Sequence, residues 1–170
     1  PLGSLAVHAI GYVGRIDESE LRRIDPGQYS GSTHIGKTGV ERSYEAVLRG
    51  RTGYQQVETN ADGRPLRILS RTPPTPGQHI YLSIDIRLQA VAEKLLENYN
   101  GAIVALDPRN GEVLALASQP TYDPNPFVNG IDFASYRTLN TSKDRPLLNR
   151  ALRGVYPPGS TIKPVSYTHL

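Results

Sequence analysis

The sequence predicts an α+β fold in which short helices and β-hairpins follow one another in two successive portions. Apolar residues recur at helical spacing near residues 39–49 and 86–99, which predicts two helices. Asp62-Gly63 and Asn110-Gly111 are dipeptides that favour tight turns, which predicts two hairpins. Three prolines within residues 71–77 predict a stiff linker between the two portions, and therefore a domain boundary.

Length and composition exclude several classes of protein. The 170 residues suffice for one domain, or two small ones, with a real core. No apolar run approaches the roughly 20 residues that cross a bilayer, so we expect a soluble chain. The net charge of +3 is small and dispersed, which argues against nucleic acid as the main partner. Cysteine is absent, which excludes disulfides, thiolate metal sites and a cysteine nucleophile.

The first portion is expected to begin with a short strand within residues 5–14 and a helical turn at 19–24. Thr38 and Glu41 form a Thr-x-x-Glu capping box at the start of the helix that follows. Gly50 suits its left-handed C-terminal cap. Strands are predicted at 54–58 and 66–69, joined by the Asp62-Gly63 turn.

The second portion is expected to begin with a strand at 80–84. Asp85 can cap the helix that follows, and we expect Leu88, Val91 and Leu95 on its buried face. Two more strands are predicted at 102–106 and 113–117, with a type I′ turn at Asn110-Gly111. A proline-rich loop at 118–130 and a short helix near 133–139 complete this portion.

Ser160 and Lys163 form the motif with the most chemistry, Ser-x-x-Lys. Residues three apart share one face of a helix, so the Lys163 amine can reach the Ser160 hydroxyl. A serine hydroxyl needs a neighbouring base, and a lysine neutralised by burial and by the helix dipole can be that base. Pro164 has no N–H to donate, so the Ser160 carbonyl needs another partner. The alternative is a serine and a solvated lysine near a helix start.

The remaining polar residues give weaker signals. His8, His34, His79 and His169 have no ligand spacing, so we expect neither a metal site nor a cofactor. Tyr122 and Phe127 either have a packing role within the fold or cover apolar surface near the loop of the active site. Several arginines form a solvated surface or, alternatively, contact an acidic partner: Arg42, Arg49, Arg51 and Arg64.

Several ordered segments resemble those of class B penicillin-binding proteins. Residues 156–164, Tyr-Pro-Pro-Gly-Ser-Thr-Ile-Lys-Pro, resemble the segment around their active serine. Residues 35–53 resemble part of their pedestal, and 107–125 resemble the first strands and the loop of their transpeptidase domain. Asn149-Arg150-Ala151 stands at the matching distance before the serine. The resemblance runs over residues 6–164 and is greatest to the elongation-specific members of Gram-negative rods.

The resemblance implies a division of the chain and a reaction. Residues 5–76 would be part of the pedestal and dimerisation module, and 77–164 the N-terminal portion of a serine transpeptidase domain. Residues 1–4 read as a tag remnant, and 165–170 as a tail foreign to the family. Ser160 would attack the D-Ala-D-Ala carbonyl of a peptidoglycan stem peptide, with Lys163 as general base. β-Lactams would acylate the same serine.

The resemblance also implies partners and a location. The partners would be a SEDS-family glycosyltransferase and a periplasmic scaffold protein of the elongation machinery. The protein would work at the periplasmic face of the bacterial inner membrane, with its native membrane anchor absent from this chain. No cofactor, metal or nucleic acid is implied.

The chain departs from the family pattern after the nucleophile. No Ser-x-Asn motif occurs, and the Lys-Thr-Gly at residues 37–39 precedes Ser160 and is interpreted as a decoy that caps a helix. Part of the oxyanion hole and of the substrate-aligning wall is therefore missing, and we expect this chain alone to be inactive. Two alternatives stay open: a non-catalytic docking module, and a Ser-x-x-Lys β-lactamase or β-lactam sensor.

Overall fold

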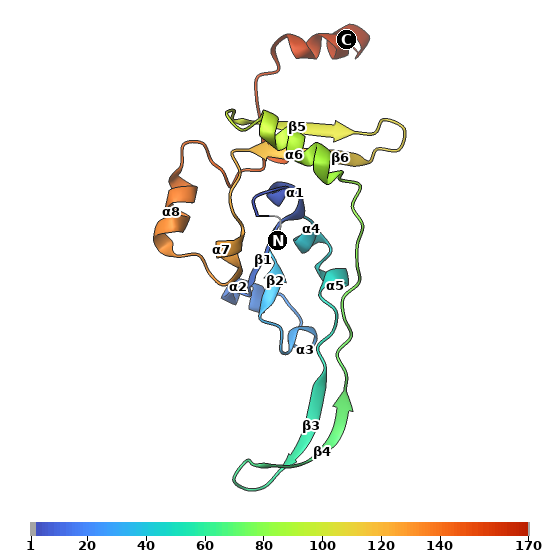
Figure 1. Ribbon diagram of the computed structural model, residues 1–170, viewed down its shortest axis with the longest axis vertical. Helices are drawn as coiled ribbons and strands as arrows, with labels where there is room; N and C mark the ends of the chain where they lie inside the picture. The colour runs from blue at the N-terminus through green and yellow to red at the C-terminus, as the bar shows by residue number, and fades with distance from the viewer. Residues whose placement is uncertain (1–2, 170) are drawn as a thin grey trace.

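The computed structural model describes residues 3–169, so residues 1–2 of the expected tag remnant and residue 170 of the expected tail lie outside it. The molecule is elongated, with a hairpin projecting at one end and the C-terminal helix at the other (Figure 1). We call residues 3–76 the N-terminal portion and residues 77–169 the C-terminal portion.

The N-terminal portion begins with a short helix where a strand was expected. Its first elements are α1 (Val7–Ile10), β1 (Val13–Arg15), α2 (Glu18–Leu21), α3 (Pro26–Tyr29) and β2 (His34–Gly36). β1 and β2 pair antiparallel, with Val13 opposite Gly36. The prediction for 5–14 is thus wrong over residues 7–10, while the helical turn near residue 19 is confirmed as α2.

The helix predicted over 39–49 is interrupted. It forms as α4 (Gly39–Ser43) and α5 (Glu45–Leu48), and Tyr44, at φ −112° and ψ 19°, ends one and begins the other. Thr38 makes no side-chain cap bond to α4, so the predicted capping box does not form. Gly50 has a φ of 72°, the left-handed conformation predicted for it.

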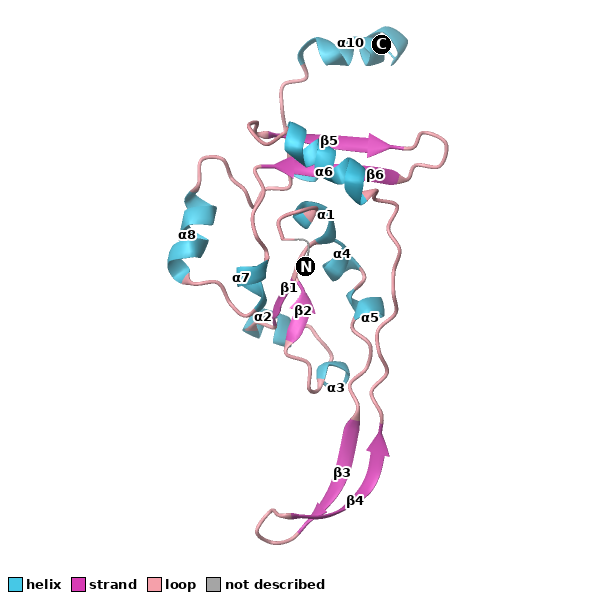
Figure 2. Ribbon diagram, viewed as in Figure 1, coloured by secondary structure: helices cyan, strands magenta, loops and turns pink. Residues whose placement is uncertain are grey.

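The predicted hairpin is confirmed as β3 (Tyr54–Thr59) and β4 (Pro65–Thr72), an arm that projects from the rest of the chain (Figure 2). The Asn60 side-chain oxygen accepts hydrogen bonds from the backbone N–H groups of Asp62 and Arg64, which closes the turn. After β4 the chain returns alongside the segment before β3. Arg51 and Thr75 exchange two backbone hydrogen bonds of 2.8 and 2.9 Å, so residues 71–77 are tied to the preceding segment.

The C-terminal portion contains one sheet of two strands, β5 (Gly101–Leu106) and β6 (Val113–Gln119), with α6 (Ile86–Leu95) packed on it. Asp85 caps α6 as predicted, accepting bonds from the N–H groups of Arg87 and Leu88. Residues 80–84 form no strand, so that prediction is wrong. The turn between β5 and β6 is the longer loop 107–112, closed by a bond from the Asp107 N–H to the Glu112 carbonyl, so the two-residue type I′ turn is wrong as well.

The buried face of α6 differs from the prediction. Leu88, Val91 and Leu95 are 40, 55 and 67 % exposed, whereas Gln89 and Ala92 are buried. The helix lies close to β6 because the residues between them are small: Ala115 and Ala117 have no exposed surface. A small and polar stripe therefore makes the contact that the larger apolar stripe was expected to make.

The rest of the C-terminal portion consists of short helices. They are α7 (Asn125–Val128), α8 (Phe133–Thr141), α9 (Arg150–Arg153), the 3₁₀ turn η1 (Gly159–Ile162) and α10 (Lys163–His169). The short helix expected near residue 133 is confirmed as α8. Over residues 3–169, none of the helices has the length and apolar character needed to span a bilayer.

Candidate active site

Ser160 and Lys163 lie on successive helical turns beyond the sheet. Ser160 is in η1 and Lys163 begins α10, and the strands β5 and β6 separate both turns from the N-terminal portion (Figure 1). Gly159 precedes the serine with a φ of 56° and with open space around its α-carbon. The side chains of Ser160 and Lys163 are both exposed.

The 3₁₀ geometry of η1 gives the Ser160 carbonyl the hydrogen-bond donor that Pro164 cannot supply. The Lys163 backbone N–H donates to the Ser160 carbonyl, so this carbonyl is satisfied without the N–H that proline lacks. The Thr161 N–H donates to the Pro158 carbonyl in the same way. The local sequence therefore builds a tight turn that carries Ser160 and Lys163 three residues apart.

This turn stands without an enclosing wall in the part of the chain that the structure describes. Neither the Ser160 hydroxyl nor the Lys163 amine makes a hydrogen bond or ion pair with another residue of 3–169. A general base needs an enclosure that favours its neutral form, and residues 3–169 do not provide one. The geometry thus presents a candidate nucleophile and a candidate base, but it does not complete a catalytic site.

The segment just before the serine is anchored to the sheet. Asn149 caps α9, and its side-chain amide donates to the His8 carbonyl at 2.9 Å. Arg150 is buried, its backbone N–H donates to the Ser118 hydroxyl at 2.9 Å, and its guanidinium donates to the carbonyls of Asp144 and Arg145. Asn149-Arg150 therefore holds the approach to Ser160 against β6 and against α1.

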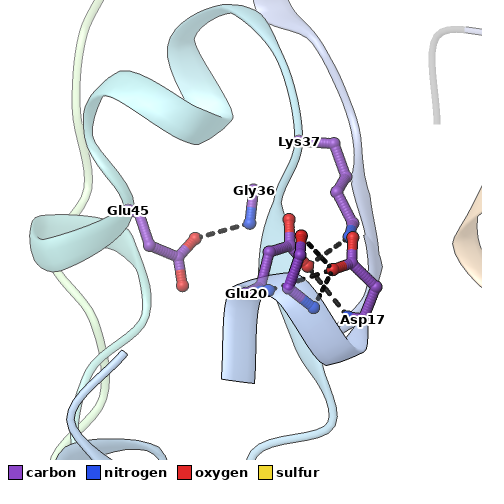
Figure 3. A network of polar contacts seen from close by, with 6 residues as sticks. Asp17, Glu20, Gly36, Lys37 and Glu45 are labelled. Carbon is purple, nitrogen blue, oxygen red and sulfur yellow. Dashed lines mark hydrogen bonds and ion pairs between the residues drawn. The ribbon is translucent and has the colours of Figure 1, made fainter. Parts of the chain in front are cut away.

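The Lys-Thr-Gly at residues 37–39 lies in the N-terminal portion, away from Ser160. Lys37 forms ion pairs with Asp17 and Glu20, as Figure 3 shows. In the same network, the Glu45 carboxylate accepts a bond from the Gly36 N–H at 2.8 Å. The Ser19 hydroxyl and the Glu20 N–H hold the pKa of Asp17 well below its usual range. This motif is part of a local ion-pair network, although Thr38 does not cap a helix as expected.

An aromatic cluster joins the two portions. His8 and Tyr12 meet Tyr122 edge-on at ring-centroid distances of 5.5 and 6.4 Å, and Phe127 packs on both Tyr12 and Tyr122. Burial raises the pKa of Tyr122 to about 12. Tyr122 and Phe127 thus have the packing role that was one of their two interpretations. His8 and Tyr12 could not be identified as their partners from the sequence, because those residues are more than a hundred positions away.

Among residues 3–169, no group of three or more His, Asp or Glu side chains is placed to hold a metal ion. The arrangement can therefore supply a serine hydroxyl and an amine, but no metal cluster among the residues that the structure describes.

Comparisons with known proteins agree with these features. The Penicillin-binding Protein dimerisation domain matches residues 1–82, and the Penicillin binding protein transpeptidase domain matches residues 101–169. The chain belongs to the penicillin-binding proteins. It combines their dimerisation domain with the beginning of their transpeptidase domain.

The relatives are more specific. A protein of Acinetobacter baumannii named peptidoglycan D,D-transpeptidase MrdA is 54 % identical over 97 % of this chain, and the chain spans 25 % of that relative. Penicillin-binding protein 2 of Pseudomonas aeruginosa, solved with WCK 5153, has a TM-score of 0.85 and 53 % identity over 98 % of this chain and 33 % of its own. The complex of penicillin-binding protein 2 and MreC from Helicobacter pylori has a TM-score of 0.85 and 41 % identity over 96 % of this chain and 30 % of its own.

Proposed function

We propose that this chain carries the nucleophile of a peptidoglycan D,D-transpeptidase. Residues 5–76 are then part of the pedestal and 77–164 the N-terminal portion of the catalytic domain, with 1–4 a tag remnant and 165–170 a tail foreign to the family. The observation that carries the proposal is the Ser160-x-x-Lys163 turn, which lies inside the stretch similar to the transpeptidase domain. The name of the Acinetobacter relative supports the reaction and the peptidoglycan substrate.

In this proposal Ser160 forms an acyl-enzyme. Its Oγ attacks the carbonyl carbon of the penultimate D-Ala of a stem peptide, and the Lys163 amine takes the hydroxyl proton. The peptide C–N bond breaks, the departing D-Ala amine receives that proton, and the stem peptide remains as an ester on Ser160. The amine of a second stem peptide then attacks the ester, which forms the crosslink and returns a proton to Ser160.

A β-lactam follows the first half of the same reaction. Ser160 Oγ attacks the lactam carbonyl, the ring C–N bond opens, and the ring nitrogen takes the proton. The penicilloyl ester stays on the serine. Because the Ser160 turn is exposed and unenclosed in this chain, we expect penicillin to acylate the 170-residue chain slowly or not at all. Loss of one oxyanion donor alone costs about 100- to 1,000-fold in rate.

Intact-mass spectrometry after incubation with penicillin tests the proposal. We expect little adduct on this chain, and a stable penicilloyl adduct on a longer chain that continues through the transpeptidase domain of its relatives. In the longer chain, Ser160→Ala abolishes the adduct and Lys163→Ala slows it about 100-fold or more, whereas Ser166→Ala leaves it unchanged. An adduct at Ser166 with Ser160 unmodified contradicts the proposal, whereas rapid stoichiometric labelling of the 170-residue chain contradicts only the expected slow acylation. Turnover of penicillin without a stable adduct indicates a β-lactamase instead.

We further propose that the protein works at the periplasmic face of the bacterial inner membrane with a SEDS-family glycosyltransferase and a periplasmic scaffold protein. The Helicobacter complex with MreC supports the scaffold partner. This docking role makes a separate prediction, since it needs the N-terminal portion and not the nucleophile. Binding of a purified scaffold protein, measured by calorimetry, is expected to be the same for the wild type and for Ser160→Ala.

A further inference from the structure

A groove of about 640 Å³ lies between the two portions of the chain. α1, α4, residues 82–84, β6 and the segment around α9 form its walls. Its lining is mainly apolar and includes Val40, Leu82, Ile84, Leu116, Tyr122 and Leu152. The volume is within the range of about 300–1,000 Å³ that is usual for ligand sites.

The charged lining of the groove has one sign. No Asp or Glu lines it, whereas Lys37, Arg42 and Arg153 do. Lys37 is neutralised by Asp17 and Glu20. Arg42 and Arg153 are exposed and form no ion pair with any residue of 3–169. The groove therefore favours a ligand that brings carboxylates to the positions of these two arginines.

One wall of the groove is a segment with the sequence of a strand but without a strand partner. Residues 80–84, Ile-Tyr-Leu-Ser-Ile, alternate apolar and polar side chains, yet they join no sheet. The Ser83 hydroxyl donates to the Val113 carbonyl at 2.8 Å, and the Asp85 N–H donates to the Leu114 carbonyl, which holds the segment beside β6. The backbone groups of Leu82 and Ile84 make no hydrogen bond within residues 3–169. Such an edge can pair with an added strand.

We propose that this groove binds an extended peptide segment of a partner protein in which apolar and acidic side chains alternate. The peptide pairs its backbone with residues 82–84. Its apolar side chains contact the apolar lining of the groove, and its carboxylates meet Arg42 and Arg153 in the same lining. Side chains of a strand alternate between faces, so one short segment can satisfy both requirements.

The unpaired backbone favours a peptide over a small molecule, because a strand offers donors and acceptors at the spacing of the edge. The charge of the chain favours a different protein over a second copy of this chain as the occupant of the groove. The exposed hairpin strand of this chain, β4, carries Arg71, which is exposed, forms no ion pair within residues 3–169 and has the same sign of charge as the groove arginines. The proposal does not depend on the reaction of Ser160.

Fluorescence anisotropy with a labelled Val-Asp-Val-Glu-Val peptide tests the proposal on the 170-residue chain. We expect saturable binding that Arg42→Glu with Arg153→Glu weakens at least tenfold. The matched control, Arg64→Glu with Arg137→Glu, makes the same charge change outside the groove lining and leaves the affinity within twofold. Ser160→Ala leaves it unchanged. Hydrogen exchange is expected to show slower exchange of the Leu82 and Ile84 amides when the peptide is bound.

Several results would overturn the proposal. One is that the acidic peptide does not bind at 1 mM, which is on the order of the weakest specific complexes. Another is that Val-Lys-Val-Lys-Val binds as tightly as the acidic peptide. A third is that the control variant loses as much affinity as the groove variant. Binding that survives N-methylation of the peptide backbone excludes strand pairing. Self-association that protects the same amides identifies a second copy as the occupant. Should the double glutamate variant fail to fold by circular dichroism, Arg42→Gln with Arg153→Gln makes the same comparison.

Discussion

Gln89 is a polar side chain with no exposed surface at the contact between α6 and β6. Its amide oxygen accepts a bond from the Leu116 N–H at 2.7 Å, and its amide nitrogen donates to the Leu116 carbonyl at 2.9 Å. The same nitrogen donates to the Glu93 carboxylate at 2.8 Å. The Gln89 side chain thus pairs with the backbone of Leu116 at the outer edge of β6, as the backbone of a neighbouring strand would.

Replacing Gln89 by leucine keeps the volume but leaves both Leu116 backbone groups without partners. Because each buried unsatisfied group costs about 1–3 kcal/mol, we expect Gln89→Leu to lower the free energy of unfolding by about 2–4 kcal/mol. Urea unfolding followed by circular dichroism measures it. Gln55→Leu, on the exposed hairpin, is the control and should stay within about 0.5 kcal/mol. Equal effects of the two substitutions would contradict this role for Gln89.

His8 is half-buried at the junction of the two portions, and its buried Nε2 has no hydrogen-bond partner within residues 3–169. Burial lowers the pKa of His8, and the charge of Arg150 acts in the same direction. The carbonyls of Pro120 and Pro146 oppose this shift. The folded chain therefore favours the neutral imidazole.

This pKa shift predicts a loss of stability in mild acid. The unfolded chain binds a proton at His8 near pH 6.5, whereas the folded chain resists it, so stability is greatest above about pH 6.5 and falls as the pH decreases toward the lowered pKa. Thermal unfolding between pH 7.5 and 5.5 measures the fall. We expect His8→Phe, which keeps an aromatic ring beside Tyr122, to flatten it. His79→Gln, at an exposed histidine, should leave it unchanged; a flat wild-type profile would refute the prediction.

The projecting hairpin is held at its base by close backbone contact. Gly77 passes so near α5 that a β-carbon on it would lie 1.8 Å from the Leu48 carbonyl oxygen. Gly63, at the tip, has a φ of 76° but open space around it. Glycine is therefore needed for space at one position and for backbone conformation at the other.

The two glycines should respond differently to alanine. Gly63→Ala adds only conformational strain, for which we expect about 1–2 kcal/mol. Gly77→Ala must push the returning segment away from α5, so we expect a larger loss of stability than for Gly63→Ala, together with faster amide exchange at Arg51 and Thr75. Hydrogen exchange and chemical denaturation of both variants measure this. Equal destabilisation of the two variants would show that the close contact between Gly77 and α5 adds no further loss of stability.

The two portions are joined by polar contacts as well as by the aromatic cluster. The Glu93 carboxylate accepts a bond from the Ala6 N–H at 2.7 Å, and the Thr121 hydroxyl donates to the Ser4 carbonyl at 3.1 Å. Asn149 adds its bond to the His8 carbonyl. Each contact links α1 or the residues before it to the sheet side, so α1 connects the two portions.

Removing the Glu93 carboxylate should loosen this connection. Hydrogen bonds to a charged group contribute about 1.5–3 kcal/mol, so we expect Glu93→Ala to lower stability by that amount. Small-angle scattering should also show a larger radius of gyration. Glu97→Ala, one turn further along the chain, is the control because its side chain has no such bond. An unchanged radius together with unchanged stability would mean that the aromatic cluster suffices.

Short-range chemistry made part of this protein predictable from sequence. Asp85 caps α6, Gly50 is left-handed, and the Asp62-Gly63 turn closes its hairpin, because each depends on atoms within a few residues. The Ser160-x-x-Lys163 turn belongs to the same class. The Ser160 carbonyl, to which Pro164 cannot donate, is also satisfied locally, by the Lys163 N–H.

Other features depended on partners far along the chain. The buried face of α6 was decided by the small residues of β6, and Thr38, expected to cap α4, lies beside Tyr122 instead. Residues 80–84 have the pattern of a strand, but a strand needs a neighbour to accept its backbone bonds, and residues 3–169 supply none. Local pattern thus determined the cap of α6, the left-handed Gly50 and the hairpin turn at Asp62-Gly63. Tertiary packing decided which face is buried and which edge stays open, because both depend on a surface that comes from elsewhere in the sequence.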